Sequence, residues 1–299
     1  MGRSSGTGPM LLGVDFSCAP TRRKPITVAR GRIEQGVLQV QQIDALPSMD
    51  GFEALLGEPG PWIGAFDFPF GLPRAFVEAQ RLGASTLAVV TELRRRCPTR
   101  MEFRALVDAW GSTLPAGQRL PHRVCDRMMP GISSTSPLQT RYVPVGFMYY
   151  EGLWRLLQAG VALPGLHEGD AARQAVEAYP GLLAHEIIGT RSYKNGDDEA
   201  RLTARKTIVQ ALVHARTRLA LPLRIPAALR RAVLADAAGD HLDALLCLVQ
   251  AAWASAQPGF GLPEAIDPVE GWIATMPLPV SARQAAARES NPVTAKEKA

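Results

Sequence analysis

The chain has 299 residues, of which 46% are hydrophobic and 20% are charged, and it carries a net charge of +5. This composition is ordinary for a soluble globular protein, and no apolar run approaches the roughly 20 residues that a membrane span requires. The sequence therefore excludes a membrane protein, and its mild positive charge permits a polyanionic partner without demanding one.

The cysteines argue against a disulfide framework and against a zinc site. None of them forms a CxxC pair, and they lie far apart in the chain, at Cys18, Cys97, Cys125 and Cys247. Scattered cysteines of this kind fit a reducing compartment, so we expect a cytoplasmic protein.

The first third of the chain predicts the start of an α/β domain. Residues 1–9 contain Gly and Ser but no apolar signal core, which indicates a flexible leader. Apolar and β-branched runs then predict three strands joined by Gly-containing turns, at residues 11–16, 25–29 and 37–40. Asp50 is expected to cap a short helix that ends near Gly57, and a fourth strand is expected at residues 62–66. This order favours a mixed sheet that contains an antiparallel meander.

The middle of the chain predicts a helical and irregular insertion into this domain, at about residues 73–170. Residues 73–110 have helical patterning, whereas residues 111–146 are rich in Pro, Gly, Ser and Arg. Irregular segments of this length are uncommon in compact domains and are often lids or binding loops. A helix is expected next, at residues 147–159.

The last third of the chain returns to strands and helices. We expect a strand that ends at Glu177, a helix or turn from Pro180, an amphipathic helix at 198–218, an apolar helix at 241–256 and a short strand at 271–274. The whole domain would span residues 10–276. The polar tail at residues 277–299 is expected to be disordered.

Four acidic residues lie directly beside segments that are expected to be buried, namely Asp15, Asp67, Glu177 and Asp243. Each has an ordinary explanation, because acids also form turns and cap helices. With Asp240 as the N-cap, Asp243 would be the third helical residue, on the same face of the helix. Yet a carboxylate among buried apolar residues is costly unless a cation or backbone N–H groups compensate its charge.

Acids from three strand ends and one buried helix suit a hard cation that prefers oxygen ligands. Mg²⁺ and Mn²⁺ bind through a few carboxylates, water molecules and substrate phosphate oxygens. Such ions activate water and stabilise the leaving oxygen in phosphodiester hydrolysis. We therefore expect Mg²⁺ or Mn²⁺ at the four acids, with Asp240 as a further ligand.

Five short segments resemble, in the same order, domain-of-unknown-function family 429, whose members are predicted RNase H-like nucleases. The segments are GVDFS at 13–17, DFPFG at 67–71, VEAYP at 176–180, DAL at 243–245 and EGWI at 270–273. Each segment is short, but together they extend over nearly the whole chain. The segment at 240–245 also resembles the last acidic motif of RuvC-type nucleases.

This resemblance implies an RNase H-like α/β fold and a metal-dependent phosphodiesterase site at the four acids. Asp15 would bridge the metal ions, Asp67 and Glu177 would complete their coordination, and Asp243 would bind the second ion or orient water. Lys194 resembles a lysine at this place in the family and would hold a phosphate. Asp67 departs from the pattern of well-studied nucleases because it follows its strand in a Pro-rich turn, so a structural role for Asp67 stays open.

Polar residues of the long loop could complete the site. Arg123, Arg127 and Arg141 lie there together with Ser136. Arginine suits bidentate contacts with phosphate, so these residues could form a lid over a nucleic acid backbone. We therefore expect a nucleic acid partner and binding that depends on salt.

Two other functions stay open from the sequence. An actin-like nucleotide-binding phosphotransferase also places acids at strand ends, but it needs glycine-rich phosphate loops. Arg22, Arg23 and Lys24 stand where such a turn would be. An RNase H-like domain could also be a catalytically silent binding module. The sequence leaves open DNA or RNA, single strand or duplex, and the oligomeric state.

Overall fold

The structure is a computed structural model that describes residues 8–278. Nearly all of the leader at 1–9 and of the tail at 277–299 lies outside the described residues, so the two expectations about them stay predictions. Within residues 8–278, no helix is both long enough and apolar enough to cross a membrane.

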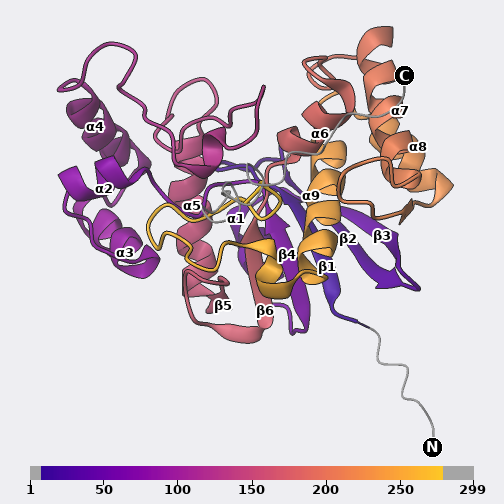
Figure 1. Ribbon diagram of the computed structural model, residues 1–299, viewed down its shortest axis with the longest axis horizontal. Helices are drawn as coiled ribbons and strands as arrows, with labels where there is room; N and C mark the ends of the chain where they lie inside the picture. Colours follow the sequence, from indigo (N-terminus) through magenta and orange to yellow (C-terminus); the bar gives the residue numbers. More distant parts are fainter. Residues whose placement is uncertain (1–7, 279–299) are drawn as a thin grey trace, which may run out of the picture.

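A seven-stranded mixed sheet forms the centre of the protein, in the order β5-β6-β4-β1-β2-β3-β7 (Figure 1). The strands are β1 Met10–Asp15, β2 Ile26–Glu34, β3 Val37–Leu46, β4 Trp62–Phe66, β5 Val161–Ala162, β6 Asp170–Glu177 and β7 Leu223–Arg224. β1, β2 and β3 form an antiparallel meander, whereas β4 is parallel to both β1 and β6. The predicted α/β mixed sheet is therefore confirmed.

Several strands differ in length from the prediction. β2 keeps its pairing with β3 beyond a bulge between Arg30 and Gly31, so both strands are longer than expected. β5 and β7 contain two residues each, too few to show alternation in the sequence. The strand expected at residues 271–274 is only an isolated bridge at Ile273. Gly271 has a φ of +67°, a left-handed conformation that interrupts a strand.

Helices cover both faces of the sheet. They are α1 Met49–Leu56, α2 Arg74–Ala79, α3 Thr86–Arg96, α4 Arg100–Gly111, α5 Val145–Gln158, α6 Pro180–Ile188, α7 Glu199–Val213, α8 Ala227–Ala235 and α9 Asp240–Ser255. Of these helices, α2 to α5 lie between β4 and β5 in the chain. Short 3-10 helices lie at Cys125–Arg127 and Pro258–Gly261. The segment between α4 and α5 is otherwise irregular, as its composition predicts.

Two helix ends differ from the prediction. The N-cap of α1 is Ser48 rather than Asp50, because the Ser48 hydroxyl accepts a hydrogen bond from the Gly51 amide at 3.2 Å. Asp50 lies in the first turn, where its charge also suits the helix N-terminus. α7 ends at Val213, before the predicted residue 218, and Ala215 just beyond it has a left-handed φ of +54°.

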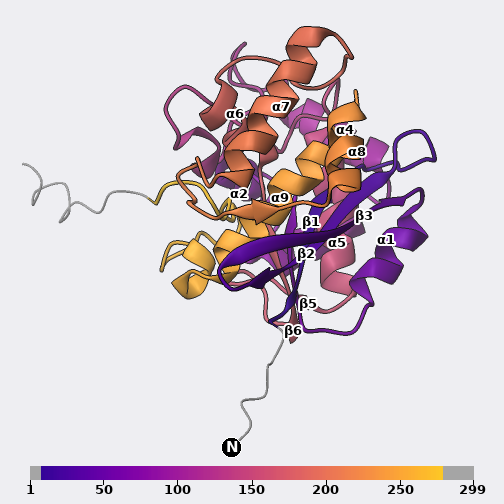
Figure 2. The same ribbon diagram turned by 90° about the vertical axis from the view of Figure 1, so that its right-hand side faces the viewer.

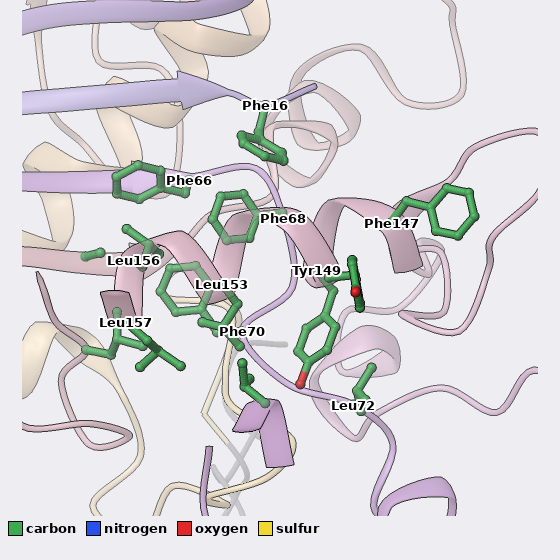
Figure 3. Close-up of a cluster of buried hydrophobic side chains, with 14 of the residues drawn as sticks. Phe16, Phe66, Phe68, Phe70, Leu72, Phe147, Tyr149, Leu153, Leu156 and Leu157 are labelled. Atoms are coloured by element: carbon green, nitrogen blue, oxygen red, sulfur yellow. The ribbon is translucent and has the colours of Figure 1, made fainter. Parts of the chain in front are cut away.

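The two faces of the sheet carry different helices (Figure 2). α1 and α5 pack on one face, whereas α9 and α7 pack on the other. On the α5 face, aromatic side chains from the end of β1, from β4 and from the turn after β4 lie together, as Figure 3 shows for Phe16, which directly follows β1, and for Phe66 and Phe68. The ring centroids of Phe16 and Phe68 are 4.8 Å apart. Burial of these large rings anchors the turn that follows β4.

On the other face, α9 crosses β1 at close range. A Cβ atom at Gly13 would lie 2.2 Å from the carbonyl oxygen of Ala244 and 2.1 Å from the amide nitrogen of Leu248. Only glycine permits this approach of the two backbones. The crossing brings the first turn of α9 to the carboxyl end of β1.

Candidate functional site

Asp15 and Asp67 lie side by side at the carboxyl ends of two adjacent parallel strands. Val14 of β1 is opposite Phe66 of β4, and the Asp67 amide donates a hydrogen bond to the Val14 carbonyl oxygen at 2.9 Å. Side chains alternate between the two faces of a sheet, and Gly13 faces α9. Asp15 and Asp67 therefore also face α9, and their charges interact.

Asp243 reaches the same place from the first turn of α9. The helix begins at Asp240, and the residue before it, Gly239, has a left-handed φ of +90°. The predicted N-cap role of Asp240 is therefore wrong, because Gly239 takes the N-cap position and makes Asp243 the fourth helical residue. The buried Asp243 carboxylate accepts hydrogen bonds from the Tyr193 hydroxyl and from Lys194 Nζ, the latter at 2.6 Å.

The two strand-end carboxylates are poorly compensated. Part of each side chain reaches solvent, yet among residues 8–278 none donates a hydrogen bond to the carboxylate of Asp15 or Asp67. Burial raises the pKa of Asp15 well above its ordinary value, and the charges of Asp243 and Asp67 raise it further. Burial and the charge of Asp243 raise the pKa of Asp67 to about 7, although Lys194 opposes the shift. The site thus concentrates negative charge that a bound cation would compensate.

The raised pKa of Asp67 predicts that the folded chain loses stability as the pH rises from about 4 to about 7. Unfolding returns the carboxyl group to its ordinary pKa of 3.8, so the folded state binds more protons than the unfolded state in this window. Urea unfolding should show a steeper decline for the wild type than for Asp67→Asn, whose amide does not titrate. The exposed Asp197→Asn is the control, and equal profiles for the wild type and Asp67→Asn would contradict the prediction.

Glu177 faces away from this group of acids. In the register of β4 and β6 it is level with Phe66, whose side chain lies in the core on the α5 face. Its carboxylate accepts hydrogen bonds from the Phe70 amide at 2.8 Å and from Arg123 at 2.6 and 2.8 Å. The structure therefore separates the four predicted ligands, since three acids come together and Glu177 is paired with an arginine.

Arg123, which we expected in an exposed lid, is 2% exposed and lies in a network of acids. Its guanidinium group donates hydrogen bonds to Asp126, to Glu177 and to the carbonyl oxygen of Glu270. Burial opposes the charge of Arg123, but the carboxylates of Asp126 and Glu177 outweigh this effect and raise its pKa. The guanidinium group is thus enclosed by protein partners instead of being presented to a phosphate.

The other predicted substrate contacts lie in different surroundings. Ser136 is buried and donates a hydrogen bond to a backbone carbonyl oxygen at 2.6 Å. Arg141 is exposed and pairs with a carboxylate of α4 at 2.6 Å, and Arg127 is exposed. Lys194, by contrast, forms its ion pair with Asp243 and so belongs to the acid group.

Two further residues complete the surroundings of Asp243. Sequence reasoning does not single out Tyr193, although its place directly before Lys194 is a weak signal. Burial and the charge of Asp243 raise the pKa of Tyr193, so its hydroxyl stays protonated and donates to that carboxylate. Asp240 is partly exposed, and burial together with the charges of Asp236 and Asp243 raises its pKa. Asp240 therefore lies at the rim of the acid group.

A cavity of about 160 Å³ opens beside the acids. Its lining includes Asp67 and Lys194 from the acid group, and Thr135, Val143 and Met148 from the long loop and α5. A ligand that reached Asp67 and Lys194 through this cavity would therefore also touch the loop between α4 and α5.

Within the described part of the chain, no group of three or more His, Cys, Asp or Glu side chains has an arrangement that could hold a metal ion. A physical reason is that both carboxylate oxygens of Asp243 are engaged, by Tyr193 and by Lys194. Only the carboxylates of Asp15 and Asp67 in this group of three acids are therefore available to a metal ion. Mg²⁺ is commonly held by one or two carboxylates together with water and substrate phosphate. This pair of carboxylates fits that requirement.

No family model, curated protein or solved structure matches this chain. The geometry defines its class as an α/β protein with a cluster of acids at the carboxyl edge of a mixed sheet. The resemblance to family 429 stays a prediction.

Proposed function

We propose that the protein is a divalent-metal-dependent phosphodiesterase that hydrolyses a nucleic acid backbone. The observation that carries this proposal is the pair of uncompensated carboxylates, Asp15 and Asp67, on adjacent parallel strands beside Asp243. The strand order, a meander continued by parallel strands, supports an RNase H-like architecture as part of the proposal. We further propose the cytoplasmic location expected from the sequence, with the four cysteines as free thiols.

In this proposal Asp15 and Asp67 hold Mg²⁺ or Mn²⁺, and Asp243 and Asp240 add negative charge beside them. When bound, such an ion acidifies water and neutralises charge on a phosphate. Lys194 supplies a second positive charge. Burial works against its ammonium group, but the carboxylates of Asp243, Asp67 and Asp15 outweigh this and raise the pKa of Lys194. It therefore stays charged at neutral pH and can attract a phosphate oxygen towards Asp67.

Calorimetry with Mn²⁺ on the metal-free chain tests the proposed metal centre. The wild type is expected to bind Mn²⁺, and the double variant Asp15→Asn with Asp243→Asn is expected to lose this binding, because one ligand charge and one neighbouring negative charge are removed. At about 100 times its Kd, Mn²⁺ should stabilise the wild type by about 2.7 kcal/mol. Asp197→Asn, which removes an exposed carboxylate, should bind like the wild type. A folded wild type that binds no Mn²⁺ would overturn the proposal.

The reaction is tested on the same proteins with labelled DNA and RNA, each as single strand and as duplex. We expect cleavage by the wild type and by Asp197→Asn that EDTA abolishes, and none by the double variant. Metal binding without cleavage of any strand would contradict the hydrolase and leave the metal centre intact.

A second candidate function is a nucleic-acid-binding module that has this fold and no catalysis. The ion pair between Lys194 and Asp243 at 2.6 Å favours it, because the ammonium group already compensates one carboxylate. Such a module would bind nucleic acid equally well with and without EDTA and would release it uncut. The cleavage experiment therefore separates the two functions.

A further inference from the structure

Three open hollows lie in series along the loop between α4 and α5. The first has a volume of about 400 Å³, and Arg119 and Tyr142 are among the residues that line it. The second has a volume of about 350 Å³ and shares Leu120 and Gln139 with the first. Shared lining residues mean that the two hollows are neighbours on the surface.

The third hollow is the cavity of about 160 Å³ beside Asp67 and Lys194. It shares Ser134 and Thr135 with the second hollow. The three hollows are therefore neighbours on the surface, and together we call them the loop track, which includes Tyr142 in its first hollow and Asp67 and Lys194 in its third.

Positive charge lies along the loop track. Arg119 and Arg127 are exposed, with guanidinium groups free of ion pairs among residues 8–278. Arg141, in the first hollow, has a side chain that is 54% exposed, and its partner Asp108 lies at 2.6 Å on the surface. Arg127 lies in the same loop as His122, which lines the second hollow. Arg119 and Arg141 line the first hollow, and exposed arginines on one loop fit the backbone of a polyanion.

Tyr142 presents an aromatic ring to solvent at the first hollow of the loop track. The residue is 99% exposed, and its φ of +54° is a left-handed conformation that is unfavourable for a bulky side chain. Its neighbour Val143 is 57% exposed and lines the cavity beside Asp67. An aromatic ring that is held at the surface and contributes nothing to the core is free to stack on a ligand.

We propose that the loop track binds single-stranded nucleic acid, with phosphates on Arg119 and Arg127 and an unpaired base stacked on Tyr142. This inference rests on the proposed function only for the cleavage of the bound strand at Asp15 and Asp67. A series of open hollows fits a flexible chain, whereas a small-molecule substrate is usually enclosed by a single pocket. Stacking on an aromatic side chain requires an unpaired base, which a single strand offers along its whole length.

The fluorescence anisotropy of a labelled single-stranded oligonucleotide, recorded in EDTA, measures this binding without cleavage. Tyr142→Ala is expected to weaken binding by roughly ten-fold, the size of one lost base–aromatic stack. The double variant Arg119→Gln with Arg127→Gln is expected to reduce the slope of log K against log salt by about 1.4, which corresponds to two phosphate contacts on a single strand. Arg231→Gln is the control, because Arg231 is exposed on α8 at the other end of the molecule from α4 (Figure 1).

Several outcomes would overturn the loop track. They are a wild type that binds no oligonucleotide, a Tyr142→Ala variant that binds like the wild type, and a double arginine variant with an unchanged salt slope. Equal affinity for a blunt duplex would overturn the choice of a single strand. Hydrolysis is judged separately by EDTA-sensitive cleavage, so failure of the loop track and failure of the proposed function are distinguishable.

Discussion

Arg123→Ala is expected to lower the free energy of unfolding by roughly 3–5 kcal/mol, the usual cost of removing one partner from a buried ion pair. The guanidinium group pairs with Asp126 at 2.9 Å and with Glu177 at 2.6 Å. These two acids are 0% and 3% exposed, so without the arginine their carboxylates would be buried and uncompensated. Urea unfolding should show a lower midpoint with an unchanged slope.

Arg127→Ala is the matched control for this prediction. Arg127 belongs to the same loop but is exposed, so its replacement should change the free energy of unfolding by no more than about 0.5 kcal/mol. Arg123→Lys refines the test, because an ammonium group keeps the charge but lacks the planar fork that contacts two carboxylates at once. A loss of stability in Arg123→Ala no larger than in the control would contradict the structural role of the network.

This network also positions the turn that carries Asp67. Glu177 accepts a hydrogen bond from the Phe70 amide at 2.8 Å, and Glu270 accepts one from the Val124 amide at 2.9 Å. The buried arginine therefore ties the end of β6 to the turn after β4 and to the long loop. Its removal is expected to disturb the acid group as well as the fold.

The grouping of Asp15, Asp67 and Asp243 could be predicted from the sequence, because each lies next to an apolar segment and the strands end at one edge. The position of the Glu177 side chain could not be predicted in this way. It depends on the register between β4 and β6, which places Glu177 opposite Phe66. A shift of one residue would turn its side chain to the α9 face. The sequence pattern of one strand does not determine its register with a partner strand that is distant in the sequence.

In the long loop, too, the local sequence does not determine where each residue lies, and its arginines show this. Its composition predicts irregular structure, and the loop is irregular apart from one short 3-10 helix at Cys125–Arg127. Yet Arg123 is buried, whereas Arg127 and Arg141 are exposed. The difference arises because Arg123 meets Glu177, 54 residues further along the chain. Local sequence shows which residues can bind phosphate, and long-range packing decides which of them reach it.

Asp15→Asn is expected to have opposite effects on activity and on stability. Cleavage should fall by roughly 100-fold or more, as when one preorganised electrostatic group is removed from a reaction centre. The free energy of unfolding at alkaline pH should rise, because burial and the charges of Asp243 and Asp67 disfavour the Asp15 carboxylate in the folded chain. In the unfolded chain these charges lie apart, so the asparagine removes a penalty that is confined to the folded state.

The pH dependence follows from the direction of the pKa shift. Folding raises the pKa of Asp15, so the wild-type carboxyl group takes up a proton as the pH falls and its penalty disappears. The stability gained by Asp15→Asn should therefore be largest at alkaline pH and shrink in acid, as measured by urea unfolding. The exposed Asp197→Asn should show neither effect. If Asp15→Asn instead lost stability at alkaline pH, the Asp15 carboxylate would stabilise the folded chain, and the prediction of an unfavourable charge at this position would be wrong.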